Sequence, residues 1–218
     1  MPGAAVEVFA TAEAVDRYPE LTAGASLVTD EALASLAETV HPQGLVAVCR
    51  HVDVDLSVAL AGRPRLVAVL AGIRDPGNAG TVLRTADAAG AGAVIFAGEA
   101  VDPYNGKCVR ASAGSLFHVD LVRAPEVPVD ALRAAGLRVL AADPRGEACL
   151  ADLPGLGAAT AWLFGSEAHG LPASAAAEAD LRVRVQIHGR AESLNLAAAA
   201  AICLYASASA HRSKEPSQ

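Results

Sequence analysis

The stretch that decides the fold spans residues 66 to 90 and reads LVAVLAGIRDPGNAGTVLRTADAAG. It begins with a continuous apolar run, Leu66–Ala71, which is typical of a strand buried on both faces of a parallel sheet. A turn rich in glycine and proline follows, and then a helical segment that we expect Asn78 to cap and Gly90 to close. Such a turn lies at the carboxyl edge of the sheet, where α/β proteins bind their ligands.

The same alternation of apolar strands and helical segments continues toward the C-terminus and predicts a parallel α/β sheet. The expected strands are 66–71, 93–97, 117–121, 138–142, 160–164 and 181–185. Helices are expected at about 79–89, 106–113, 128–135, 172–178 and 194–209. The main domain is therefore predicted over residues 60–218.

Residues 1–59 form a different kind of segment. Short apolar runs at 26–29 and 44–48 predict strands on either side of a helix that Asp30 would cap and that would extend to about residue 39. The segment has only Arg17 and Arg50 against nine acidic residues, whereas residues 60–218 hold fifteen of each sign. The net charge of −7 thus resides in the first segment, and an RNA partner would meet the second one.

Composition excludes several classes of protein. Hydrophobic residues make up 53% and charged residues 19% of the 218 residues, and the mean hydropathy is +0.34, which excludes a disordered chain. The longest apolar run, 196–206, is too short to span a membrane, and the first residues make a poor secretory signal, so we expect a cytoplasmic protein. The four cysteines are scattered, and no metal site is expected.

A second informative stretch, WLFGSEAHGLP at 162–172, is an apolar strand followed by a loop that contains one carboxylate, Glu167. Ser166 follows Gly165 directly, so the G-x-S-x-G elbow of a serine hydrolase is not present. The simplest alternative role for Glu167 is to accept hydrogen bonds from its own loop.

A third stretch, VQIHGRAESLNLAAAAAICLY at 185–205, predicts a loop followed by a buried helix that Ser193 would cap.

The first stretch leaves two alternatives to consider. Its glycines at 72, 77 and 80 do not form the G-x-G-x-x-G pattern of a dinucleotide-binding loop, which disfavours a nicotinamide-dependent enzyme. Arg84 would be held near the strand ends, and the alternative for this side chain is an exposed pair with Asp87 on the same helix.

Taken in order, these stretches resemble the SpoU (TrmH-like) family of SPOUT methyltransferases, which methylate the ribose 2′-oxygen of RNA. The first motif corresponds to Asp75–Gly80 with Arg84 and Gly90, the second to Phe164–Glu167 with Gly170 and Leu171, and the third to Ser193–Leu196 with the alanine-rich helix. Residues 107–114 also resemble the segment that lies between the first two motifs. The resemblance covers about 60–210, while residues 1–59 are similar only to the latter part of the family's ribosomal-protein-like RNA-binding domain, whose first half we expect to be missing.

The resemblance implies an α/β SPOUT fold with a deep trefoil knot at about 160–210, an exception to unknotted chain connectivity. It also implies S-adenosylmethionine as cofactor, no metal, and a homodimer with the active site near the interface. The residues that it places at the cofactor are Phe164, Gly165, Ser166, Gly170, Ile187, Ser193, Leu194, Asn195 and Leu196. Those that it places in the reaction are Asn78, Arg84, Glu167, Ser193 and Asn195, and the expected RNA contacts are Arg74, Arg84, Lys107 and Arg110.

The expected reaction is attack of a ribose 2′-oxygen on the sulfonium methyl group. A guanidinium stays protonated at neutral pH, so we expect Arg84 to bind the adjacent phosphate and stabilise developing alkoxide charge, rather than to accept the proton. Ribosomal RNA is the expected substrate because residues 1–59 resemble a domain of rRNA-directed members. Transfer RNA is the alternative substrate, and a non-catalytic RNA-binding protein on the same scaffold is the alternative function.

Overall fold

The structure is a computed structural model that describes residues 3–37, 39 and 41–212. The chain forms two compact units, Met1–Val52 and Asp53–Gln218. The transition lies a few residues before the one expected from composition, because the short helix α3 (Leu56–Ala61) packs on the second unit, where Ala59 joins its core.

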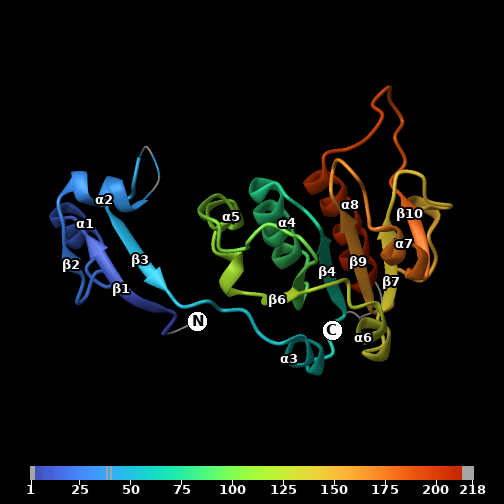
Figure 1. Cartoon of the computed structure of the whole chain (residues 1–218), viewed down its shortest axis with the longest axis horizontal. Coiled ribbons are helices and arrows are strands. Elements are labelled where there is room, and N and C mark those ends of the chain that lie inside the picture. Colours follow the sequence, from blue (N-terminus) through green and yellow to red (C-terminus); the bar gives the residue numbers. More distant parts are fainter. Residues whose placement is uncertain (1–2, 38, 40, 213–218) are drawn as a thin grey trace. The chain divides into compact units, whose positions relative to one another are not determined.

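The first unit is a three-stranded sheet with two helices (Figure 1). Its elements are β1 (Ala5–Ala10), α1 (Ala12–Arg17), β2 (Ser26–Leu27), α2 (Asp30–Ala37) and β3 (Leu45–Cys49). The central strand β1 pairs in parallel with β2 and antiparallel with β3. Helix α2 is capped by Thr29, whose hydroxyl accepts from the Ala32 N–H at 3.2 Å, so the predicted Asp30 cap was wrong by one residue. Residues 38 and 40, at the expected end of this helix, lie outside the described part.

The second unit is built on a wholly parallel seven-stranded sheet, in the order β6-β5-β4-β9-β7-β10-β8. Its strands are β4 (Leu66–Ala71), β5 (Ala93–Ala97), β6 (Asp120–Ala124), β7 (Arg138–Ala142), β8 (Ala148–Cys149), β9 (Thr160–Gly165) and β10 (Leu181–Arg184). The predicted α/β class and parallel sheet are confirmed. Strand β4 pairs with both β5 and β9, which brings the two glycine-containing turns of the sequence to one edge.

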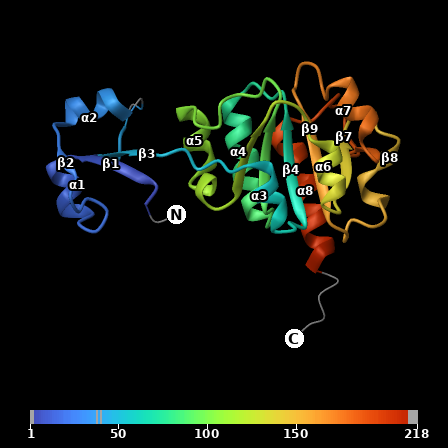
Figure 2. The same ribbon diagram turned by 60° about the horizontal axis from the view of Figure 1, so that its bottom comes forward.

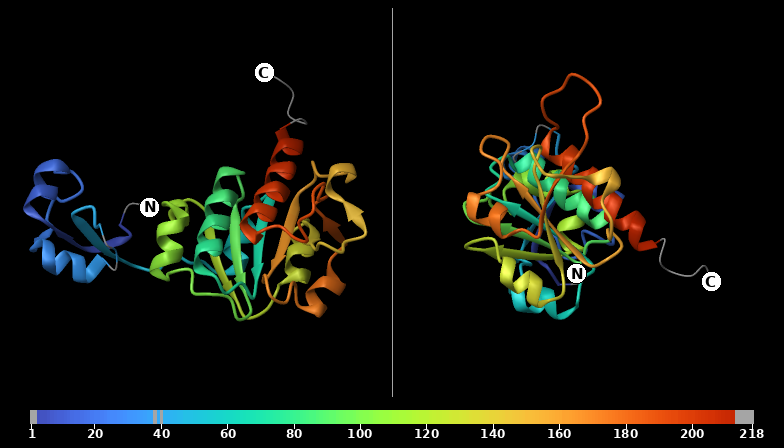
Figure 3. Two further views of the ribbon diagram at one scale, coloured as in Figure 1. Left: turned by 90° about the horizontal axis from the view of Figure 1, so that it is seen from above. Right: turned by 90° about the vertical axis from the view of Figure 1, so that its right-hand side faces the viewer.

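Helices cover both faces of this sheet (Figures 2 and 3). One face packs against α4 (Pro76–Ala88) and α8 (Leu196–Arg212), and α5 (Gly106–Ser112) packs on α4. The other packs against α3, α6 (Val129–Ala134) and α7 (Ala173–Glu178), where Leu132 and Ala175 meet Val69, Ile95 and Leu163 of the strands. Because successive strand residues point to opposite faces, the continuous apolar runs of the sequence serve both layers.

One strand was predicted three residues too early. Phe117, where the strand was expected to begin, is the last residue of a short 3-10 helix (Ser115–Phe117) that follows Gly114, whose φ is +92°. Strand β6 begins only at Asp120, which pairs with Ala93 of β5. Hydrophobic periodicity cannot distinguish a buried turn from the first residues of a buried strand.

Helix α8 is joined to the middle of the sheet by a buried hydrogen bond. The indole Nε1 of Trp162 in β9 donates to the Ser207 hydroxyl at 2.9 Å, and neither residue is exposed to solvent. The trefoil knot expected over about 160–210 stays a prediction. Within the described residues, no helix combines the length and apolar character needed to cross a membrane.

Candidate active site

The first motif is the N-terminus of α4. Asp75 has extended backbone angles, and its Oδ1 accepts from the Asn78 N–H at 2.7 Å, while Pro76 occupies the first helical position. Asp75 is therefore the cap, and the expectation that Asn78 caps the helix was wrong. The Asn78 N–H and the ammonium of Lys107 hold the pKa of Asp75 below its ordinary value, because both stabilise the ionised carboxylate. With Asp75 as the cap, the Asn78 side chain is left available for other contacts.

The Asn78 side chain joins all three sequence motifs. Its Nδ2 donates to Oε1 of Glu167, in the loop after β9, and its Oδ1 accepts from Nδ2 of Asn195 at 3.2 Å. The amide orientation is consistent with both partners, because a carboxylate can only accept here and the Asn195 amide donates. Residues 89 and 117 positions apart in the sequence thus meet at a single side chain.

Asn195 also begins the last helix. Its Oδ1 accepts from the N–H groups of Ala197 at 2.9 Å and Ala198 at 3.3 Å. Asn195 therefore caps α8, and the predicted Ser193 cap was wrong by two residues. Ser193 lies in the exposed loop that follows β10, which projects at the top of the view in Figure 1.

The loop after β9 folds tightly on its own backbone. The N–H and C=O groups of Ser166 and Gly170 bond to each other at 3.1 and 2.8 Å, and the Ser166 hydroxyl accepts from the His169 N–H at 3.2 Å. A Cβ at Gly165 would lie 2.2 Å from backbone atoms of Gly170 and Leu171, so only glycine fits there. This close approach holds Glu167 at the edge of the sheet, where it accepts from Asn78.

A cavity of about 830 Å³ lies beside the cluster formed by Asn78, Glu167 and Asn195, called the Asn78 cluster. Eight of the nine residues expected at the cofactor line it: Phe164, Gly165, Ser166, Gly170, Ile187, Ser193, Leu194 and Leu196. Asn195 is the ninth and is not among the lining residues, because its amide is turned toward Asn78 and the helix. The volume lies within the range of cofactor sites, and the walls are apolar apart from a few polar groups.

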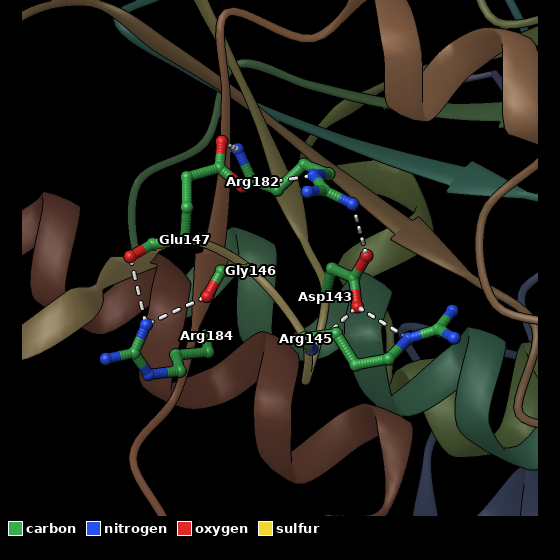
Figure 4. Close-up of polar contacts among 6 residues, drawn as sticks. All are labelled: Asp143, Arg145, Gly146, Glu147, Arg182 and Arg184. Atoms are coloured by element: carbon green, nitrogen blue, oxygen red, sulfur yellow. Dashed lines mark hydrogen bonds and ion pairs between the residues drawn. The ribbon is translucent and has the colours of Figure 1, made fainter.

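Charged side chains form one border of the cavity (Figure 4). Arg182 of β10 donates from Nε to Oε2 of Glu147 at 3.0 Å, and its Nη1 lies 3.9 Å from Oδ2 of Asp143. Arg145 lies 3.9 Å from the same Asp143 carboxylate, and its side chain is 92% exposed. An apolar cavity with this border suits a ligand that has an aromatic body and a charged end.

Comparison with known proteins identifies the family. Residues 65–205 match the model of the SpoU rRNA Methylase family. The chain belongs to this family. Among curated SpoU relatives, the 23S rRNA (guanosine(2553)-2'-O)-methyltransferase RlmP of Bacillus subtilis is 39% identical over 115 residues, which cover 52% of this chain and 44% of the relative. The chain spans about half the length of the curated relatives that it matches.

Solved SpoU structures resemble a larger part of the chain. AviRb from Streptomyces viridochromogenes, in complex with the cofactor AdoMet, gives a TM-score of 0.81 at 32% identity and covers 96% of this chain and 84% of its own. An AdoMet-bound rRNA methyltransferase from Sinorhizobium meliloti gives 0.79 at 30% identity, over 97% of this chain and 81% of its own. The sheet and its helices therefore have the fold of SpoU methyltransferases.

Arg84, which the SpoU resemblance places in the reaction, lies apart from the Asn78 cluster. Its side chain is exposed on α4, and within the described residues it forms no hydrogen bond or ion pair. Asp87, the alternative partner considered from the sequence, contacts Nδ1 of His118 at 2.8 Å instead. The alternative pair of Arg84 with Asp87 is therefore not formed, and Arg84 is available to a ligand or a partner.

The other cationic residues expected to contact RNA are exposed and differ in their partners. Arg74 pairs with Glu99 at 3.1 Å, and Lys107 pairs with Asp75 at 3.1 Å. Arg110 lies on α5 with no ion pair in the described residues. These contacts leave the Arg110 guanidinium free, whereas Lys107 is engaged by the first SpoU motif.

Sequence reasoning missed two sets of residues at this SpoU site. Asp75 could have been found as the cap because it stands directly before a proline at the first helical position. Asp143 and Arg145 could have been found because they follow β7 at the carboxyl edge of the sheet. The role of Arg182 has no such signal, since it depends on the pairing of β10 with β7 and β8.

Proposed function

We propose that this protein transfers a methyl group from S-adenosylmethionine to a ribose 2′-oxygen of ribosomal RNA. The observation that carries the proposal is the contact of Asn78 with Glu167 and Asn195 beside the 830 Å³ cavity. It joins the three motifs of the family at one point. The proposed substrate follows the Bacillus relative, which is named for 23S rRNA. The proposed cofactor follows the solved neighbours, which are named as bound to AdoMet.

The residues of the cavity fit this cofactor. Phe164, Ile187 and Leu196 offer apolar surface to an adenine ring, and the absence of a side chain at Gly165 lets the loop backbone of Gly170 and Leu171 pack closely at the cavity. The charged border near Asp143 suits the amino-acid end of the molecule. When bound, the cofactor supplies the electrophilic methyl group.

The chain's own residues would orient the RNA and stabilise charge. Arg84 would bind the phosphate next to the modified ribose and stabilise the alkoxide as it develops, while Asn78 and Glu167 would orient the ribose. Ser193 and Asn195 would shape the same site. The proton of the 2′-hydroxyl would pass to that phosphate or to a nearby group, since the guanidinium remains protonated.

Two substitutions test the role of Arg84. Arg84→Ala is expected to bind S-adenosylhomocysteine normally and to lose methyl transfer by roughly 100-fold or more. Arg84→Lys is expected to be severely impaired as well, because a planar, bidentate phosphate contact is lost. Turnover near that of the wild type in either variant would overturn the role.

Two copies of the chain are proposed to form the working enzyme. Ile202 and Tyr205 lie three positions apart on α8, are 42% and 72% exposed, and therefore share one face of the helix. This face would be covered by a second copy, which would bring the partner's α4 toward the site. Sedimentation equilibrium of the wild type and of Tyr205→Glu tests the proposal, with a dimer and a monomer expected respectively.

The first unit is proposed to contribute to recognition of the RNA. Its seven acidic residues against two arginines in residues 1–52 do not suit phosphate, so its contribution would come from base or ribose contacts. The cationic contacts would then lie at Arg74, Arg84 and Arg110, whereas Lys107 is held by Asp75. Charge reversal at Arg110 is expected to weaken rRNA binding and to lower its salt dependence by about one counterion.

The deciding experiment offers labelled S-adenosylmethionine and the protein to unmodified rRNA and, separately, to unmodified tRNA. Label on the ribose of rRNA is the expected result. Label on tRNA alone would move the proposal to that substrate. No label, with cofactor binding shown by a higher melting temperature in S-adenosylhomocysteine, would favour a binding protein on the same scaffold.

A further inference from the structure

Lys107 lies on α5, outside the three motifs, yet it contacts the residue that starts α4. Its Nζ donates to Oδ2 of Asp75 at 3.1 Å. The other oxygen of the same carboxylate, Oδ1, accepts from the Asn78 N–H at 2.7 Å. Both oxygens of Asp75 are therefore held from different directions, one by its own helix and one by a neighbouring helix.

Helices α4 and α5 pack closely at this contact. A Cβ at Gly80 of α4 would lie 2.3 Å from the Cys108 carbonyl oxygen of α5, so the two backbones touch. A Cβ at Gly77 would lie 3.1 Å from Cε of Lys107, which shows that the lysine stem passes beside this glycine. Because Gly77 and Gly80 have no side chains, α5 packs closely on α4 and the Lys107 side chain reaches Asp75.

The position of Lys107 is poor for the stability of its own helix. It lies in the first turn of α5, after the cap Asn105, and a cation is disfavoured at the positive end of a helix dipole. Its side chain is 60% exposed and that of Asp75 is 44% exposed, so the ion pair adds little to folding. A role other than stability explains why a lysine occupies this turn.

We propose that Lys107 is a positioning residue, which holds Asn78 in place through Asp75. The contact runs from the Lys107 ammonium to the Asp75 carboxylate, then to the Asn78 backbone, and so to the side chain that meets Glu167 and Asn195. Loss of the ammonium leaves one Asp75 oxygen without its partner and lets the first turn of α4 shift relative to Glu167. The proposal rests on the methyl transfer proposed above and specifies what that site requires.

The first test measures catalysis in four variants. Lys107→Met is expected to lower kcat roughly 10-fold to 100-fold with an unchanged KM for S-adenosylmethionine, since small misplacements of a catalytic group cost this much. Lys107→Arg should restore most of kcat. Asp75→Asn keeps a capping oxygen but loses the charge, and it should lower kcat to the same extent, alone or combined with Lys107→Met.

A matched control removes an equal charge elsewhere. Arg63 is exposed, precedes β4 at the opposite edge of the sheet, and forms no ion pair within the described residues. Arg63→Met should therefore leave kcat unchanged. If Lys107→Met instead raises only the KM for rRNA and leaves kcat intact, Lys107 is a phosphate contact and the positioning role is overturned.

The second test does not depend on activity. The side-chain NH₂ group of Asn78, assigned in ¹H–¹⁵N spectra by its disappearance in Asn78→Ala, should shift in Lys107→Met and stay in place in Arg63→Met and Lys107→Arg. Unchanged resonances in Lys107→Met would overturn the proposal. If the wild type transfers no methyl group, the proposed function fails by itself, and this spectrum still decides whether Lys107 positions Asn78.

Discussion

The Asn195 side chain donates from Nδ2 to Oδ1 of Asn78 at 3.2 Å, across 117 positions of sequence. The same amide accepts through Oδ1 from the N–H groups of Ala197 and Ala198, which caps α8. One half of this amide therefore serves the stability of a helix, and the other half fixes a residue of the candidate active site. The two roles can be separated because they use different atoms.

Asn195→Asp is expected to separate them. Aspartate keeps the capping oxygen and suits the positive end of α8, so the free energy of unfolding should change by less than about 0.5 kcal/mol. It replaces the donor to Asn78 by a second acceptor, and methyl transfer should fall roughly 10-fold or more. Parallel denaturation curves and initial rates check both statements.

Asn195→Ala is the matched comparison. It removes the cap as well as the donor, so it should lose about 1 kcal/mol of stability in addition to activity. The assignment of two roles to one amide would be contradicted if Asn195→Asp were as unstable as Asn195→Ala, or if it kept full turnover.

Gly165→Ala should destroy the cavity rather than only weaken the reaction. The added Cβ would meet backbone atoms of Gly170 and Leu171 at 2.2 Å, and neither can rotate away as a side chain could. We expect loss of S-adenosylhomocysteine binding by calorimetry and a lower melting temperature. Gly189→Ala is the control, because its Cβ would meet nothing within 4 Å and its φ is not positive; equal damage from the two substitutions would contradict this account.

Much of the second unit could be predicted from local sequence. The strands β4, β5 and β7 have the expected bounds because each is a continuous apolar run between turn residues. Strand β6 does not have the expected bounds. The chain after Gly114 first forms a 3-10 turn, which is buried and largely apolar like the start of a strand. Apolar residues indicate burial, but they do not indicate which backbone conformation is buried.

The candidate site was predictable as a set of residues but not as a set of contacts. Asn78, Glu167 and Asn195 were all selected, yet both helix caps near them, those of α4 and α8, were assigned to the wrong residue. Several polar side chains near a helix start can each satisfy its free N–H groups, and local sequence does not rank Asp75 against Asn78 or Ser193 against Asn195. The tertiary contact decides, because the cap that is chosen leaves Asn78 free to bridge the other two motifs.

Ser207→Ala should destabilise the second unit without touching the site. It leaves the buried Trp162 indole N–H without its acceptor, which costs about 1–3 kcal/mol. Urea unfolding measures the loss, and Ser35→Ala is the control, since that exposed hydroxyl only bonds within α2 and should cost less than about 0.5 kcal/mol. If the double variant Trp162→Phe/Ser207→Ala costs the full sum of its single changes, the hydrogen bond does not carry the effect.

Acid should lower the stability of the second unit through Asp53, the residue at which the chain joins β6. The Tyr104 hydroxyl donates to Oδ1 of Asp53 at 2.6 Å and the Arg123 guanidinium donates to Oδ2 at 3.0 Å, and they hold the pKa of Asp53 below its ordinary value of 3.8. The neighbouring Val54 N–H donates to the Leu121 carbonyl of β6 at 2.8 Å, so this carboxylate lies where the chain joins the edge of the sheet. The ionised form is favoured in the folded protein.

A lowered pKa fixes the direction of the pH dependence. The stabilisation by Asp53 is fully present above about pH 4 and is lost as the pH falls through the folded pKa, which lies below 3.8. The difference in unfolding free energy between the wild type and Asp53→Asn should therefore be constant from pH 7 to 5 and shrink in more acidic solution. Tyr104→Phe removes the largest cause of the lowered pKa. The unfolding free energy of this variant should therefore fall less on acidification than that of the wild type. A difference that grows on acidification would mean that the carboxylate is not the stabilising form.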